Sequence, residues 1–255
     1  MPLSGFDRFE FRDGGIEHEV FRGGKGPAVI LMHELPGMTP ECIALADRLV
    51  ARGFTVYLPL LFGKPGVTAT TSNLLRLCIR REFRLLAKKD SGPITGWLRA
   101  LARQAHVECR GKGVGAIGMC LTGGFALALM LEPATLAAVA CQPSLPLGLG
   151  AARKRALGLT AGELAAAKER AAAGVVPLCL RFTGDPISPP QRLERLREEF
   201  GAALEVIEIN SSPGNSHGLP SAAHSTLTAE YKDDPAHPTW QALERVVAVL
   251  GERLR

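Results

Sequence analysis

The chain lacks the features that mark several large classes of protein. Aromatic residues make up only 5% of it, and its 30 basic residues are interleaved with 25 acidic ones. Neither a base-stacking platform nor a basic nucleic-acid-binding stripe is therefore expected. No run of about 18 or more apolar residues occurs that could span a membrane. The first residues also lack the apolar segment of a signal peptide, so we expect a cytoplasmic protein without nucleic-acid or membrane partners.

The cysteines form no recognisable metal or disulfide pattern. Six of them are scattered through the chain, at positions 42, 78, 109, 120, 141 and 179. No pair has the CxxC spacing, and no Cys/His zinc pattern accompanies them. In a chain of 255 residues this arrangement indicates reduced thiols rather than a disulfide framework, as expected in a cytoplasm.

Predicted strands and helices alternate after an initial hairpin. The hairpin pairs residues 6–12 with residues 16–22. The residues between them, Asp13-Gly14-Gly15, are typical of a tight β-turn. Further strands are predicted at 28–32, 54–58, 113–118, 136–141, 175–183 and 203–209. This rhythm predicts an α/β fold with a mostly parallel sheet of about eight strands and helices on both faces. Ligands of such sheets bind at the carboxyl ends of the strands.

We interpret residues 1–255 as a single domain, because no linker rich in proline, glycine or serine divides them. Residues 146–174 exceed the minimal plan and are rich in alanine and arginine. Within them Thr160 and Glu163 form a capping box that opens a helix. Two interpretations stay open for this segment: a helical lid above the site, or a longer crossover without a gating role.

One cysteine stands at a sharp strand-to-helix junction. The apolar run Val114–Ile117 ends in Gly118-Met119-Cys120, and the helical pattern 125–131 begins shortly afterwards. A nucleophile between small residues on such a turn is typical of the nucleophile elbow of α/β-hydrolases. Thr122 departs from the glycine usual in that motif. The alternative is a buried structural cysteine beside a glycine-rich helix start.

A thiol nucleophile needs a base and an acid, which follow it along the chain in α/β-hydrolases. Asp185 lies in a Gly-Asp-Pro turn after a predicted strand, although aspartate is also common in turns for local reasons. His217 and His224 both follow the last strand, and the residues alone leave the choice of base between them open. The N–H group of Leu121, directly after Cys120, would face the oxyanion of an attacked acyl group.

The chain resembles the dienelactone hydrolase family of α/β-hydrolases over nearly its whole length. The matching residues are Gly118-Met119-Cys120-Leu121 with Gly123-Gly124, Glu34 after the third strand, Asp185, and a histidine followed by serine. The resemblance implies a Cys-His-Asp triad that hydrolyses lactones and esters without a metal or an organic cofactor. The position of the His-Ser pair before the C-terminal helix favours His224, with His217 as the alternative.

The resemblance also implies a role for Glu34. In the family this glutamate touches the resting cysteine, and a carboxylate near the thiol opposes formation of the thiolate. An anionic substrate that displaces Glu34 would release the thiolate. Leu35 would supply the second oxyanion N–H group. The alternative is an exposed loop acid, but the apolar neighbours Met32 and Leu35 favour the functional role.

The residues that would hold an anionic substrate match the family only in part. The family has an arginine shortly after the catalytic histidine, where this chain has Ser225 to Thr228. On a helix predicted between residues 72 and 88, Arg81 falls on an apolar face. We expect Arg81 to contact a substrate carboxylate, the alternative being a pair with Glu82 or another acid.

Together these observations predict a cysteine-dependent hydrolase of a small-molecule ester or lactone, anionic if Arg81 binds it. Cys120 would attack the carbonyl group, His224 would transfer the proton, and Asp185 would orient the imidazole. A thioesterase or general carboxylesterase with the same residues is one alternative. A non-catalytic binding or thiol-sensing protein is the other. No residue pattern specifies the acyl group or the oligomeric state.

Overall fold

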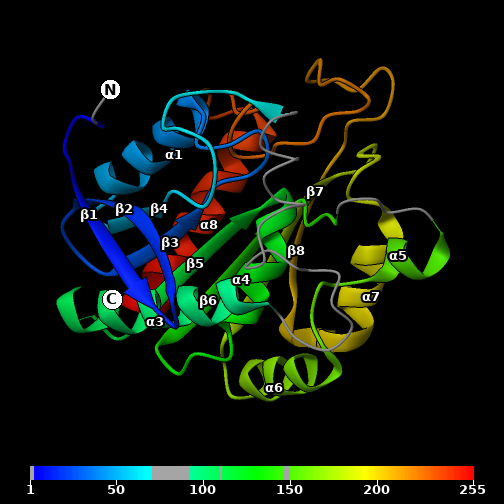
Figure 1. Cartoon of the computed structure of the whole chain (residues 1–255). Helices are drawn as coiled ribbons and strands as arrows, with labels where there is room; N and C mark the ends of the chain where they lie inside the picture. Colours follow the sequence, from blue (N-terminus) through cyan, green and yellow to red (C-terminus); the bar gives the residue numbers. More distant parts are fainter. Residues whose placement is uncertain (1–2, 71–91, 110, 146–149) are drawn as a thin grey trace.

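The computed structural model describes residues 3–70, 92–109, 111–145 and 150–255. A single eight-stranded sheet runs through it in the order β1-β2-β4-β3-β5-β6-β7-β8 (Figure 1). Its strands are β1 (Phe6–Asp13), β2 (Ile16–Gly24), β3 (Ala28–Met32), β4 (Thr55–Pro59), β5 (Val114–Met119), β6 (Thr135–Cys141), β7 (Val176–Phe182) and β8 (Glu205–Ile209). The β1–β2 hairpin and the β2–β4 pair are antiparallel, and the other pairs are parallel. The predicted α/β fold with a mostly parallel sheet is confirmed.

Side-chain caps open some of the helices. They are α1 (Pro40–Ala51), α3 (Pro93–Cys109), α4 (Gly123–Leu129), α5 (Ala151–Arg155), α6 (Ala161–Ala172), α7 (Pro190–Phe200) and α8 (Pro238–Leu254). Thr39 accepts a hydrogen bond from the N–H group of Cys42 at the start of α1. The capping box of Thr160 and Glu163 is formed in both directions at the start of α6. Each contact satisfies a backbone donor that the first helical turn leaves free.

Both faces of the sheet are covered, which explains why the central strands are apolar throughout. Val29 and Leu31 of β3 pack on the side of α1 and α8. Ile30 and Met32 point the other way, toward α3 and α4. The same face continues under α6 and α7, beyond β6 (Figure 1). No described helix has both the length and the apolar composition to cross a bilayer.

The segment 146–174 is described from residue 150 onward and contains α5 and α6. Leu157 and Ala167 are buried against α7. The buried Arg192 of α7 donates hydrogen bonds to the backbone carbonyl groups of Arg153 and Ala156. These contacts fasten the segment to the body of the fold, whereas its function as lid or crossover stays a prediction. The helix predicted between residues 72 and 88, with Arg81, lies outside the described residues.

Candidate active site

The predicted strand–turn–helix around Cys120 is present. β5 ends at Met119, and a short 3₁₀ turn, η2 (Cys120–Thr122), leads directly into α4. Cys120 has a φ of 54°, in the left-handed region that non-glycine residues rarely adopt. A Cβ atom on Gly118 would lie 2.0 Å from the carbonyl oxygen of Thr122, so this position requires glycine. The turn thus presents the cysteine at the carboxyl end of a central strand.

Thr122 has a structural reason to replace the glycine usual in the motif. Its hydroxyl oxygen is buried and accepts a hydrogen bond of 2.8 Å from the N–H group of Met119. The same hydroxyl group lies 3.1 Å from the carbonyl oxygen of Met32, at the end of β3. Thr122 therefore ties the elbow to the neighbouring strand.

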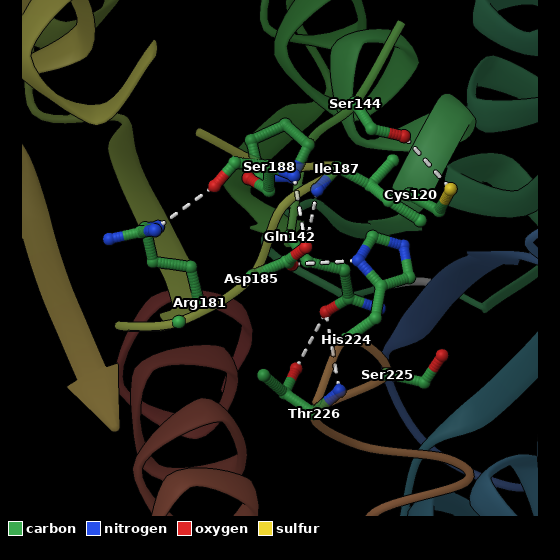
Figure 2. Close-up of polar contacts among 12 residues, drawn as sticks. Cys120, Gln142, Ser144, Arg181, Asp185, Ile187, Ser188, His224, Ser225 and Thr226 are labelled. Atoms are coloured by element: carbon green, nitrogen blue, oxygen red, sulfur yellow. Dashed lines mark hydrogen bonds and ion pairs between the residues drawn. The ribbon is translucent and has the colours of Figure 1, made fainter. Parts of the chain in front are cut away.

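Asp185 and His224 meet beside Cys120 (Figure 2). Nδ1 of His224 lies 2.7 Å from Oδ2 of Asp185, which is 2% exposed. The other carboxylate oxygen, Oδ1, accepts hydrogen bonds from the N–H groups of Ile187 (2.9 Å) and Ser188 (3.0 Å). The carboxylate is therefore held from both sides, in the turn that follows β7.

The imidazole of His224 lies between Asp185 and Cys120 (Figure 2). Burial lowers its pKa, but contacts with Asp185 and Cys120 raise it more, and the net pKa is about 10. Nε2 is buried and has no hydrogen-bond partner among the described residues. Asp185 thus engages Nδ1 of the ring and leaves Nε2 unused. His217, the other candidate base, is exposed and packs its ring against His237.

Glu34 follows β3 and is 4% exposed, so it is not an exposed loop acid. Oε1 accepts a hydrogen bond of 2.5 Å from the hydroxyl group of Thr228. Oε2 accepts bonds from Ser225 (2.9 Å) and from the side-chain amide of Gln142 (3.3 Å). Burial raises the pKa of this carboxyl group, and the three donors lower it only in part. The segment that lacks the family's arginine thus supplies hydroxyl groups to Glu34.

Gln142 is a member of the site that the sequence did not predict. It follows β6 with a φ of 36°, again in the left-handed region. Its side-chain oxygen accepts a hydrogen bond of 2.8 Å from the hydroxyl group of Thr226, while its amide group donates to Glu34. Gln142 therefore links the loop after β3 to the loop that carries His224. A polar residue directly after a buried strand was the available signal.

Ser144 is a second unpredicted member. Its hydroxyl oxygen lies 2.9 Å from Sγ of Cys120, and its backbone N–H group donates to the carbonyl oxygen of Cys120. The side chain is buried. The resemblance implies that Glu34 touches the resting thiol, and the structure adds Ser144 within hydrogen-bonding distance of Sγ. Glu34 contacts other donors, although its nearest oxygen still lies within 4.8 Å of Sγ.

Replacing Ser144 with alanine should make the Cys120 thiol less reactive. When the imidazole of His224 takes up the thiol proton, the hydroxyl group of Ser144 can donate to the thiolate. A hydrogen bond to a charged group contributes about 1.5–3 kcal/mol, so we expect iodoacetamide to alkylate Cys120 at least about tenfold more slowly near neutral pH. The measurement is mass spectrometry of the Cys120 adduct across a pH series, with Ser212→Ala at an exposed position as the control. An unchanged pH profile in Ser144→Ala would contradict the contact.

The predicted oxyanion donors follow the ends of two neighbouring strands. Leu121 lies just beyond the end of β5, and Leu35 lies three residues beyond the end of β3. The strands β3 and β5 pair in parallel. Their N–H groups are therefore carried at the same edge of the sheet as Cys120. Arg81, predicted to contact the substrate, lies outside the described residues.

His33, next to Glu34, is fully buried and holds the loop after β3 in place. Its Nε2 accepts a hydrogen bond of 3.1 Å from the N–H group of Leu61, and its Nδ1 lies 3.2 Å from the carbonyl oxygen of Glu34. The ring packs edge-on against Phe62. Burial lowers the pKa of His33 from 6.5 to about 4. The fold thus favours the neutral imidazole.

His33 should make the stability of the protein depend on pH. Its folded-state pKa is depressed, so its contribution is complete above pH 6.5 and is lost as the pH falls from 6.5 toward 4. The loss amounts to about 3 kcal/mol at most. Urea unfolding at several pH values between 7.5 and 4.5 measures it, by comparison of the wild type with His33→Gln. Because carboxyl groups titrate in both proteins, the difference in slope is the readout. Equal slopes would exclude His33 as the source.

Comparison with known families and structures agrees with this architecture. The sequence model of the dienelactone hydrolase family matches residues 18–252. No curated protein sequence gives a significant match.

Solved structures share the fold at low sequence identity. A Klebsiella pneumoniae protein assigned to the dienelactone hydrolases is 20% identical, with a TM-score of 0.62 over 95% of this chain and 98% of its own. The dienelactone hydrolase of Anabaena variabilis is 14% identical, with a TM-score of 0.61 over 98% and 100%. Esterase 2 of Thermogutta terrifontis is 15% identical, with a TM-score of 0.60 over 99% and 96%. At these identities the likeness shows the fold.

Proposed function

The chain belongs to the dienelactone hydrolase family and is a carboxylic ester hydrolase, and we propose that it works through a Cys120-His224-Asp185 triad. The observation that carries this proposal is the 2.7 Å contact between His224 and the buried carboxylate of Asp185, with Nε2 left free beside the elbow cysteine. A histidine oriented by a carboxylate and placed next to a nucleophile is the arrangement that acyl transfer requires.

The reaction proceeds in two halves. The thiol proton of Cys120 is held on Nε2 of His224, in keeping with the raised pKa of that imidazole, and the thiolate Sγ attacks the carbonyl carbon to form a C–S bond. The N–H groups of Leu121 and Leu35 stabilise the resulting oxyanion. Collapse of this intermediate breaks the ester C–O bond, and the leaving oxygen takes the proton from the imidazolium. Water then gives a proton to Nε2 of His224 and attacks the thioester. The C–S bond breaks, the carboxylic acid is released, and the thiolate of Cys120 with the protonated His224 is restored.

The environment of His224 suits this chemistry. Asp185 holds Nδ1, so the proton that arrives at Nε2 creates an imidazolium beside a buried carboxylate. The raised pKa of His224 reflects the same stabilisation. The hydroxyl group of Ser144, 2.9 Å from Sγ, can donate to the thiolate. Both charges of the activated pair therefore have a partner.

The finer parts of the proposal concern substrate and setting. We assign a small-molecule lactone or ester as substrate and the cytoplasm as the place of action. Arg81 is the proposed contact for a substrate carboxylate. The segment 146–174 is proposed as a cover of the site, the alternative being a crossover without a gating role. No metal or organic cofactor enters the proposed mechanism.

Active-site titration tests the proposal. The wild-type protein is incubated with iodoacetamide, and hydrolysis of 4-nitrophenyl acetate is followed together with mass spectrometry of the cysteine-containing peptides. We expect activity to fall in proportion to the Cys120 adduct, and excess ester to protect that thiol. A lactone and a thioester are assayed in parallel, to distinguish lactonase activity from thioesterase activity. Full activity with Cys120 completely alkylated, or tight ligand binding without turnover of any of the three, would reject the proposal.

A further inference from the structure

The active site contains a second chemical possibility besides hydrolysis. Cys120, His224 and Glu34 form the one group in the described part of the chain whose thiol, imidazole and carboxylate atoms all lie within 4.8 Å of one another. We propose that these three side chains bind a single Zn²⁺ ion, and that the bound ion reversibly blocks hydrolysis. The inhibitory effect rests on the proposed function, whereas the binding itself does not.

The distances suit a zinc ion after small movements. Three atoms within 4.8 Å of one another share a central point no more than about 2.8 Å from each of them. Zinc binds sulfur at about 2.3 Å and nitrogen or carboxylate oxygen at about 2.0–2.2 Å. Side-chain movements of less than about 1 Å therefore bring the three ligands into contact with the ion. A water molecule completes four-coordination, as in zinc sites with three protein ligands.

Two of the ligands already have the outer contacts that zinc sites use. Asp185 fixes Nδ1 of His224, so that Nε2 is left without a partner and faces the thiol. Thr228 and Ser225 each bind one oxygen of Glu34. Carboxylate–histidine and hydroxyl–carboxylate contacts of this kind orient metal ligands and increase their affinity.

The chemistry of the ligands favours Zn²⁺ over the hard divalent cations. A thiolate with an imidazole suits Zn²⁺, whereas Mg²⁺ and Ca²⁺ require sites made of oxygen ligands. A bound ion occupies the electron pair with which Sγ would attack the ester, and it occupies the nitrogen that would accept the thiol proton. Nucleophile and base are therefore lost together. Removal of the ion by a chelator restores both.

Zinc titration against a chromophoric zinc indicator tests the proposal directly. We expect the wild type to bind one ion, with affinity at least about tenfold weaker in Glu34→Gln and Glu34→Asp and weaker still in Cys120→Ala. Cys109→Ala serves as the matched thiol control, because Cys109 lies outside the group and is partly exposed. His217→Asn tests the competing pair of imidazoles at His217 and His237. Both controls should bind zinc like the wild type.

Two further readouts separate the possible results. Co²⁺ should give a thiolate-to-metal absorption band in the wild type and none in Cys120→Ala. Hydrolysis of 4-nitrophenyl acetate by the wild type should fall in step with zinc occupancy and recover with a chelator. Wild-type affinity in Cys120→Ala, wild-type affinity in both Glu34 variants, or loss of binding in His217→Asn would overturn the site. Zinc binding without any turnover would support the site and reject the proposed function. Unchanged turnover by the wild type at full zinc occupancy would overturn the proposed block of hydrolysis.

Discussion

Replacing Cys120 with alanine should reduce kcat for an activated ester by roughly 10⁵-fold, because removal of the nucleophile from a catalytic triad has effects of that order. The change also removes the group to which Ser144 and His224 are directed. Three of the other described thiols, those of Cys42, Cys141 and Cys179, are buried. The measurement is the steady-state rate of nitrophenol release, with folding checked by circular dichroism.

Cys109→Ala is the control for this experiment. It removes a partly exposed thiol at the end of α3 and should leave kcat unchanged. Cys120→Ser separates nucleophile from shape, because a hydroxyl group fills the same space but gives up its proton far less readily. We expect it to be nearly as inactive as the alanine variant. Wild-type turnover in either Cys120 variant would remove the thiol from the mechanism.

Local sequence signals were sufficient for the framework of the fold. The apolar run 28–32 coincides with β3, because a strand covered on both faces has no polar side to interrupt the pattern. The elbow was predictable for a related reason. Glycine at position 118 and a helix start a few residues later are local requirements of a sharp turn, and the 2.0 Å approach to Thr122 shows why. Both signals lie within a few residues of the element that they specify.

The contacts inside the site depend on residues far apart in sequence, and local patterns carried little information about them. Thr228 reaches Glu34 across 194 positions, and Gln142 reaches it across 108. The family resemblance placed Glu34 near the thiol but could not reveal that its hydrogen bonds go to these partners. Ser144 gave no signal either, because one serine in a loop has many local explanations. Such pairings arise only when the sheet brings its strand ends together.

Replacing Asp185 with asparagine should reduce kcat by roughly 10⁴-fold while leaving the fold intact, as in triads whose acid is changed to the amide. The reason lies in the turn after β7. The N–H groups of Ile187 and Ser188 both donate to Oδ1 of Asp185, so an asparagine must keep its oxygen there. Its amide group then occupies the place of Oδ2 and donates to Nδ1 of His224.

This reversal puts the imidazole proton on the wrong nitrogen. With Nδ1 as acceptor, neutral His224 carries its hydrogen on Nε2 and cannot accept a proton from Cys120. The carboxylate that helps to raise the pKa of His224 to about 10 is also lost, so that pKa should fall and the pH–rate profile should move with it. Asp47→Asn, at an exposed position on α1, should change neither rate nor profile. Wild-type kcat in Asp185→Asn would show that the 2.7 Å contact is structural, and a lost rate with an unshifted profile would assign Asp185 to positioning alone.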